Sequence, residues 1–145
     1  MLKESRVKVG IKLEEEMTYK CDLGKIKMED LFIDETHKRY SNKIGPNPTS
    51  LLALSVLSCL AASFTFCLKK KGFTLEELNG KAEVVLRRNK KGFWRLKKIY
   101  ITITPTIDDP NIRKRADICM KFFEQYCIIS ESLRDGMEVD VKIDY

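Results

Sequence analysis

The chain has 145 residues, the usual length of one domain and enough to bury about two-thirds of the surface that the unfolded chain exposes. With 43% hydrophobic and 33% charged residues, the composition excludes a collagen-like or a disordered protein, since disordered chains lack the apolar residues that offset the entropy of ordering. The net charge is +6, but the segment from Lys69 to Lys98 alone has eleven basic and three acidic residues, or +8, so we expect a single domain over residues 1–145 with a local basic surface.

The longest apolar run, residues 51–68, is interrupted by serines and is followed by three consecutive lysines. We expect it to be too polar and too short to span a membrane. The first 16 residues alternate between apolar and charged residues and do not form the continuous apolar stretch of a signal peptide. A cytoplasmic protein is therefore expected.

Three strands are expected in the first third of the chain. Residues 7–13 alternate with period two between apolar and polar or small residues, which is typical of a half-buried strand. Residues 17–22 and 25–33 predict two more strands, joined by a turn at Asp22–Gly24. Residues 34–47 are polar and contain Gly45-Pro46, so we expect a long loop of the kind that is often functional.

Asn47-Pro48 predicts the start of a long helix, because asparagine caps a helix and proline fits its first position. The helix should continue to about Lys71 or Gly72. Its residues are apolar or small on all sides, which predicts burial on most faces. Thr74 and Glu77 have the spacing of a capping box and predict a brief turn.

A second pair of strands is expected at residues 81–88 and 93–105. Residues 87–92 are basic and end in glycine, as in the tip of a β-hairpin, so we interpret most of the basic surface as solvated charge. The alternative is a positive stripe over residues 69–98 that binds a polyanion.

Asp109-Pro110 predicts a second helix, which should break at residues 127–129. Ser130 is expected to cap a short turn that continues to Arg134. Residues 137–145 alternate again and predict a last strand. The order β-β-β-α-β-β-α-β describes an α+β fold in which antiparallel strands wrap a long central helix.

The five cysteines are an odd number, and none forms a C-x-x-C pair. This argues against a disulfide framework, and the single histidine, His37, argues against a zinc site. We expect no metal and no cofactor. For Cys21, Cys67 and Cys119 we expect an inert packing role, because free cysteine is among the most buried residue types.

Cys59 and Cys127 lie in more suggestive surroundings. Cys59 is within the long helix among small side chains that allow another segment to approach. Cys127 lies at the helix break, just before a new helix N-terminus that can lower the pKa of a thiol. Nothing in the spacing alone pairs the two cysteines.

These residues resemble the OsmC/Ohr family of osmotically induced and organic-hydroperoxide-resistance proteins. The resemblance rests on Gly45-Pro46-Asn47-Pro48, on Cys59 eleven residues after Pro48, and on Cys127 followed by Ser130 near the end of the second helix. It covers nearly the whole chain. It implies an OsmC-like fold and a homodimer with sites shared between subunits.

The resemblance also implies the reaction, which is reduction of organic hydroperoxides by two cysteines and an arginine. By position, Cys59 corresponds to the peroxidatic cysteine, Cys127 to the resolving cysteine and Arg39 to the arginine. A lipoyl-bearing protein or a small thiol would serve as reductant. The chain departs from the family at Thr49, where glutamate is frequent, and at Ile128, where proline is common.

Three side chains near these positions have simpler interpretations. His37 is expected at the surface of the loop, and Glu124 and Glu131 on helix surfaces, although either acid could orient Arg39. Two alternative functions remain open: a redox sensor without turnover, and a polyanion-binding module. Nucleic acid is not expected as the main partner.

Overall fold

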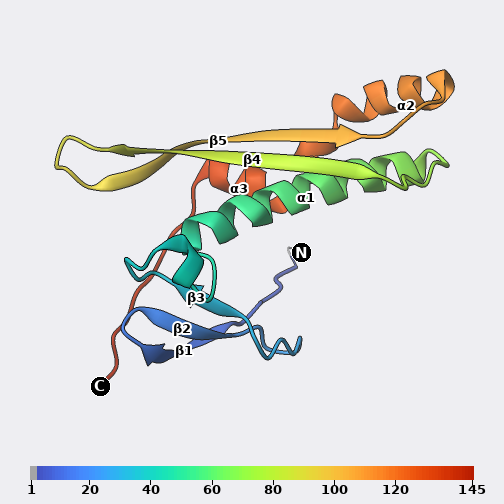
Figure 1. The fold of residues 1–145 in the computed structure, drawn as a ribbon. Coiled ribbons are helices and arrows are strands. Elements are labelled where there is room, and N and C mark those ends of the chain that lie inside the picture. The colour runs from blue at the N-terminus through green and yellow to red at the C-terminus, as the bar shows by residue number, and fades with distance from the viewer. Residues whose placement is uncertain (1–2) are drawn as a thin grey trace. The chain divides into compact units, whose positions relative to one another are not determined.

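The computed structural model describes residues 3–145 and has an α+β architecture (Figure 1). Contacts divide the chain into two compact units, the first ending at Leu51 and the second running from Leu52 to Tyr145. All sheet pairs are antiparallel, as expected. The two units are described one at a time.

The first unit contains a three-stranded sheet in the order β1-β2-β3. Its strands are β1 (Gly10–Glu15), β2 (Thr18–Asp22) and β3 (Phe32–Asp34). Gly24 has a φ of 71°, and its N–H donates to Asp22 Oδ1 over 2.8 Å, which confirms the predicted turn. The third strand is shorter than the predicted 25–33, because most of the residues before Phe32 lie outside the ladder.

Asp34 organises the loop that follows β3. Its buried carboxylate accepts hydrogen bonds from the N–H of Thr36 at 2.9 Å, from Thr36 Oγ1 at 2.5 Å and from the N–H of Ile44 at 3.2 Å. The hydrogen bond from the Thr36 hydroxyl is the main reason that the pKa of Asp34 is lowered. The loop also contains a short 3-10 helix, η1 (Tyr40–Asn42). It is therefore an ordered segment.

The long helix α1 (Pro48–Lys70) begins and ends where the sequence predicts. Asn47 Oδ1 accepts a hydrogen bond from the N–H of Ser50 at 2.8 Å, and Gly72 has a φ of 84°. The prediction of burial on most faces is wrong for this chain. The buried residues form a single stripe at intervals of three or four: Ala53, Val56, Leu60, Phe64 and Leu68.

By length and composition alone, α1 is long and apolar enough to cross a membrane, but one such helix is weak evidence for a membrane span. Core helices of globular proteins meet the same criterion. Here Val56 and Leu60 pack against isoleucines of the neighbouring strand, which is the arrangement of a core helix.

The second unit is built on a long hairpin that runs alongside α1 (Figure 1). Its strands are β4 (Leu78–Arg88) and β5 (Trp94–Pro105), which confirms the predicted pair and places residues 89–93 at the tip. A Cβ added at Gly80 would come within 2.8 Å of Leu57 Cδ1, so the glycine permits the strand to approach the helix closely. No helix or strand forms at residues 74–77, and the predicted turn there is wrong.

Two helices complete the second unit. Asp109 caps α2 (Pro110–Met120), as predicted, by accepting from the N–H of Asn111 at 2.8 Å. A 3-10 turn, η2 (Phe123–Tyr126), then leads to α3 (Ile128–Asp135). The residue that caps α3 is Cys127 and not Ser130, so that part of the prediction is wrong.

Residues 137–145 form no strand, contrary to the prediction. Their apolar side chains are exposed, with Val139 and Val141 each 82% accessible. A strand requires a neighbour to accept its backbone hydrogen bonds, and the described residues pair no strand with this segment. The sequence alternates, but within residues 3–145 no strand lies beside this segment to pair with it.

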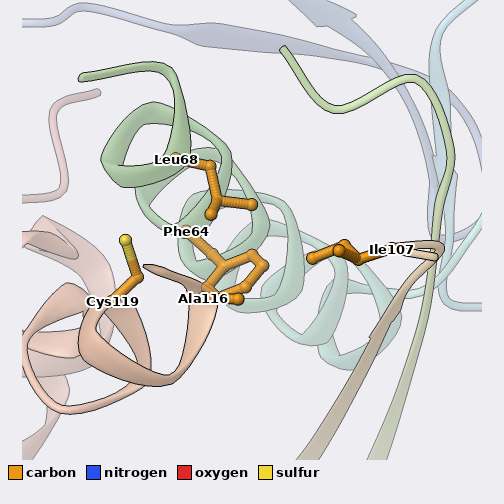
Figure 2. Packing of buried hydrophobic residues seen from close by; sticks show 5 residues of the cluster. All are labelled: Phe64, Leu68, Ile107, Ala116 and Cys119. Carbon is orange, nitrogen blue, oxygen red and sulfur yellow. The ribbon is translucent and has the colours of Figure 1, made fainter. Parts of the chain in front are cut away.

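The main core cluster joins α1 to α2. Figure 2 shows Phe64 and Leu68 from α1, Ala116 and Cys119 from α2, and Ile107 from the connection before α2, all buried together. At this junction Cys67 and Cys119 form a disulfide across 52 residues, with their Cα atoms 5.9 Å apart. The expectation that both are inert packing residues is therefore wrong, because α2 folds back beside the end of α1.

Candidate functional site

The candidate site lies in the second unit, where α1, β5 and α3 meet. Cys59 of α1 is partly buried and packs against a cluster that includes Cys127, which is fully buried. The other members of the cluster are apolar: Val56, Leu60, Ile99, Ile101, Ile103, Phe123 and Ile129. The structure thus brings together two cysteines that are 68 residues apart in the sequence.

The start of α3 supplies hydrogen-bond donors to both sulfur atoms. The N–H of Ser130 donates to Cys127 Sγ over 3.4 Å, and the N–H groups of Ile128 and Ile129 interact with Cys59. These amides have no intrahelical acceptors because they belong to the first turn of the helix. A sulfur atom that accepts from them satisfies donors that would otherwise be unpaired.

The two thiols have opposite tendencies to ionise. Burial is the main reason that the pKa of Cys59 is raised; Cys127 raises it as well, and the amides of Ile129 and Ile128 lower it only in part. Burial also raises the pKa of Cys127, but the nearby Ser130 side chain, the Cys59 thiol and backbone amides at the start of α3 outweigh burial, so the pKa is lowered. The lowering agrees with the expectation for a thiol at a helix N-terminus.

The two thiols therefore differ in acidity. Cys127 is the group that loses its proton first, and Cys59 is the group that solvent can reach. A neighbouring pair of this kind can be oxidised by two electrons to a disulfide. Among residues 3–145, no group of three His, Cys, Asp or Glu side chains could hold a metal ion.

Two cavities adjoin the thiol cluster. One has a volume of about 670 Å³ and is lined largely by apolar side chains, among them Leu60, Phe64, Ile101 and Phe123. The other, of about 550 Å³, is lined by Val56, Leu60, Ser130 and Leu133, with charged side chains from Arg134, Lys97 and Lys98. Both offer space for an apolar ligand beside the cluster.

The acids that flank Cys127 are held by Arg134. This arginine donates to Glu124 over 2.8 Å and also to Glu131, one turn earlier on the same helix. Glu124 precedes Cys127 and Arg134 follows it, so the ion pair spans the turn that carries the cysteine. Neither acid is available as a free carboxylate in this unit.

Arg39 and His37 both lie in the first unit. Arg39 precedes η1 as its N-cap residue, without a capping hydrogen bond from its side chain, and is exposed. His37 is exposed as well, which agrees with its interpretation as a surface residue. The roles of Cys59, Cys127 and Arg39 in a reaction remain predictions.

Sequence reasoning missed two features of this region. The first is the Cys67–Cys119 disulfide, for which the sequence contains no local signal. The second is the use of Ser130 as a donor to Cys127; the signal was present in the Cys-x-x-Ser spacing, which is that of an N-cap residue and its N3 residue.

The fold and the paired thiols define an α+β protein with a two-cysteine site. The profile of the family described as OsmC-like protein matches residues 40–142. The chain therefore belongs to the OsmC-like family. No curated protein sequence matches it.

Solved structures agree with this assignment at the level of the fold. An OsmC-like protein from Mycoplasma pneumoniae is 16% identical with a TM-score of 0.65, covering 91% of this chain and 89% of the other. An OsmC-like protein of unknown function from Vibrio cholerae is 11% identical, with a TM-score of 0.70 and coverages of 89% and 94%. The organic hydroperoxide resistance protein OhrB of Bacillus subtilis is 17% identical, with a TM-score of 0.64 and coverages of 90% and 91%.

Proposed function

We propose that this protein is a thiol-dependent peroxidase that reduces organic hydroperoxides to alcohols. The observation that carries the proposal is the packing of Cys59 and Cys127 in one cluster beside the start of α3, which unites a partly exposed thiol with a thiol of lowered pKa. Membership of the OsmC-like family and the fold shared with a hydroperoxide resistance protein support the same reaction.

In the first step, the Cys59 thiolate attacks one oxygen of the hydroperoxide. A sulfur–oxygen bond forms and the oxygen–oxygen bond breaks. The leaving alkoxide takes up the proton released by the thiol and becomes an alcohol, while Cys59 becomes a sulfenic acid. Because burial and Cys127 raise the pKa of Cys59, this step needs a cation, and we propose Arg39 for that role.

In the second step, the Cys127 thiolate attacks the sulfenic sulfur. A sulfur–sulfur bond forms, the sulfur–oxygen bond breaks, and the hydroxide leaves as water after taking up a proton. The lowered pKa of Cys127 supports this role, because the attacking group is a thiolate, and its full burial keeps it from competing with Cys59 for peroxide. An external dithiol, either a lipoyl group or a small dithiol, then reduces the disulfide.

The apolar cavity of about 670 Å³ supports a substrate with a hydrocarbon group. Transfer of such a group from water to an apolar cavity is favourable, whereas hydrogen peroxide has no apolar surface to bury. We therefore expect a larger kcat/KM for cumene hydroperoxide than for hydrogen peroxide.

The proposal is tested by adding one equivalent of cumene hydroperoxide to the reduced protein and mapping disulfides by mass spectrometry. A Cys59–Cys127 bond together with catalytic consumption of peroxide in the presence of dihydrolipoamide is expected. C59S should abolish consumption, and C21S is the matched control, because Cys21 is a free cysteine in β2. Consumption by C59S at the parent rate would refute the mechanism.

The role of Arg39 is tested separately with R39K and R39A. Lysine keeps the charge but not the planar guanidinium, so R39K should retain part of the activity and R39A should lose about 100-fold in kcat/KM, as when one stabilising donor is removed from an active site. Unchanged activity in R39A would remove Arg39 from the site.

We further propose that the protein acts as a homodimer. The exposed apolar residues Leu54 and Phe66 on α1 and the unpaired segment 137–145 support a second copy as the partner that covers them. The cytoplasmic location stays a prediction. The Cys67–Cys119 disulfide argues against this location, because stable disulfides are rare in the cytosol.

A second candidate function is polyanion binding by the β4–β5 hairpin. Basic and aromatic side chains alternate on its exposed surface, with Arg88 4.7 Å from the ring of Trp94 and Lys98 4.5 Å from that of Tyr100. Single-stranded nucleic acids bind to such mixtures of charge and stacking surface. Affinity for an oligonucleotide that falls steeply with salt and ignores alkylation of cysteines would favour this candidate.

A redox sensor using the same two cysteines would also form the Cys59–Cys127 disulfide. It differs from the peroxidase in turnover, since a sensor stays oxidised when dihydrolipoamide and excess hydroperoxide are present. The rate of peroxide consumption therefore separates these two functions.

A further inference from the structure

Ser130 is buried beside the candidate site in an unusual state. Its side chain is 6% exposed, and its hydroxyl oxygen has no hydrogen-bond partner of normal geometry among residues 3–145. A buried hydroxyl without a partner is unfavourable and rare in folded proteins. The hydroxyl therefore needs a group near Ser130 that becomes a hydrogen-bond acceptor for it when the protonation state of the site changes.

That acceptor is the sulfur of Cys127. The Ser130 N–H already donates to Cys127 Sγ over 3.4 Å, so the same residue contacts the sulfur through its backbone, and a change of the serine rotamer would let the hydroxyl donate to it as well. A neutral thiol is a weak acceptor, whereas a thiolate is a strong one. A hydroxyl that donates to this sulfur is therefore stabilised more strongly when Cys127 has lost its proton.

We propose that Ser130 is a positioning residue of the thiol site: its amide and its buried hydroxyl together hold the Cys127 sulfur as a thiolate beside Cys59. The inference rests on the proposed function for its role in catalysis, but the state of Cys127 that it describes does not. Ser130 acts through Cys127 and does not itself touch the substrate.

The surroundings of Cys127 leave few other groups for this task. The elements packed against it contribute Cys59 from α1, apolar isoleucines from β5 and Phe123 from η2. Charged side chains line the adjoining cavity, namely Glu124, Arg134, Lys97 and Lys98, and Glu124 is paired with Arg134. Burial raises the pKa of Cys127, and the Ser130 hydroxyl is the largest of the contributions that lower it.

The first test measures the ionisation of Cys127 directly. In a C21A/C59S background, with Cys67 and Cys119 bonded to each other, Cys127 is the one cysteine left free. Titration of the ultraviolet absorbance of the thiolate then gives its pKa. S130A should raise this pKa by about one pH unit or more, since a hydrogen bond to a charged group is worth at least a factor of ten.

Two variants control this titration. S130T keeps the hydroxyl and should restore the parent pKa, while S132A removes a hydroxyl from the same helix and should leave the pKa unchanged. If S130A titrates as the parent does, the proposal fails. If S130A does not fold, S130T provides the test. A folded S130T in which the pKa of Cys127 is raised, although the hydroxyl is kept, would also contradict the proposal.

The second test uses the chain with all its cysteines and cumene hydroperoxide. S130A should form the Cys59 sulfenic acid no more slowly than the parent and close the disulfide about tenfold more slowly, as trapping with dimedone and mass spectrometry would detect. Equal closure rates would overturn the role of Ser130 while leaving the peroxidase intact. If the parent consumes no hydroperoxide, the proposed function fails, and the titration still decides the state of Cys127.

Discussion

At the scale of single residues, local hydrogen bonds decide how acidic groups behave in this protein. Cys127 has a lowered pKa although it is fully buried, because donors at the start of α3 face its sulfur. Asp34 has a lowered pKa for the same kind of reason, with three donors directed at one carboxylate. In both cases burial alone would have raised the pKa.

The pKa of Asp34 makes the stability of the first unit depend on pH. A carboxyl group whose pKa is lower in the folded chain stabilises the fold above its unfolded value of about 3.9, and this stabilisation is lost as pH falls through the folded pKa. When the stability of the parent is followed by circular dichroism, it should therefore keep decreasing as the pH falls below about 3.9.

The variant D34N tests this assignment. An amide keeps the shape of the carboxyl group but has no charge, so D34N should be less stable than the parent at neutral pH and should lose the acid-dependent part of the difference at low pH. Exposed Asp22 provides the control D22N. Parallel stability curves for D34N and the parent across this range would contradict the role of Asp34.

At the scale of elements, local signals in the sequence predict where helices begin and end, but not which elements meet. Asn47-Pro48 and Asp109-Pro110 fix the starts of α1 and α2 through capping oxygens that lie in the same few residues. The contact between α1 and α2 depends on the path of the 39 residues between them and cannot be read from spacing. For that reason the Cys67–Cys119 bond escaped sequence reasoning, and Cys59 and Cys127 were brought together only by the resemblance to a family.

The Cys67–Cys119 disulfide should stabilise the second unit substantially. A bond that closes a loop of 52 residues removes chain entropy from the unfolded state equivalent to about 4 kcal/mol. C67S/C119S should lower the thermal midpoint measured by calorimetry, and reduction of the parent should have a similar effect. A parent that melts identically with and without reductant, while peptide mapping finds the bond intact at the start, would contradict this prediction.

The loop before α1 requires a glycine at position 45. A Cβ added there would overlap the backbone carbonyl of Phe32, which cannot move as a flexible side chain can. G45A should therefore destabilise the loop before α1 by about 1–3 kcal/mol, the usual cost of overpacking. At Gly10 the nearest atom would be 3.9 Å away, so G10A is the control in denaturant unfolding. Equal stabilities of G45A and G10A would contradict the close approach.

At the scale of the whole molecule, the single chain leaves apolar side chains exposed on several elements, among them α1 and the C-terminal segment. Residues 137–145 alternate as a strand does, but they form no strand in the structure. An alternating sequence shows which side chains are apolar and does not show which element would pack against them. The same reason explains why α1 is apolar on all sides in sequence and buried along one stripe in the structure.

A homodimer that buries the C-terminal segment would be disrupted by charge on its apolar side. V141D should raise the dimer dissociation constant at least about tenfold, since a buried unpaired charge costs more than the 1.4 kcal/mol that a factor of ten represents. K142D places the same charge on the opposite side of the segment and is the control. Light scattering over a dilution series measures both, and a V141D dimer as tight as that of K142D would contradict this interface.

The cap of α3 is a sulfur atom that the proposed reaction consumes. Once Cys127 is bonded to Cys59, its sulfur is a poorer acceptor, and the amide of Ser130 loses the partner that it has at 3.4 Å. The first turn of the helix then opens more readily to water. Amide hydrogen exchange at Ser130 would thus report the oxidation state of the protein. The amide is protected when the two thiols are reduced and exchanges faster when they are joined in a disulfide.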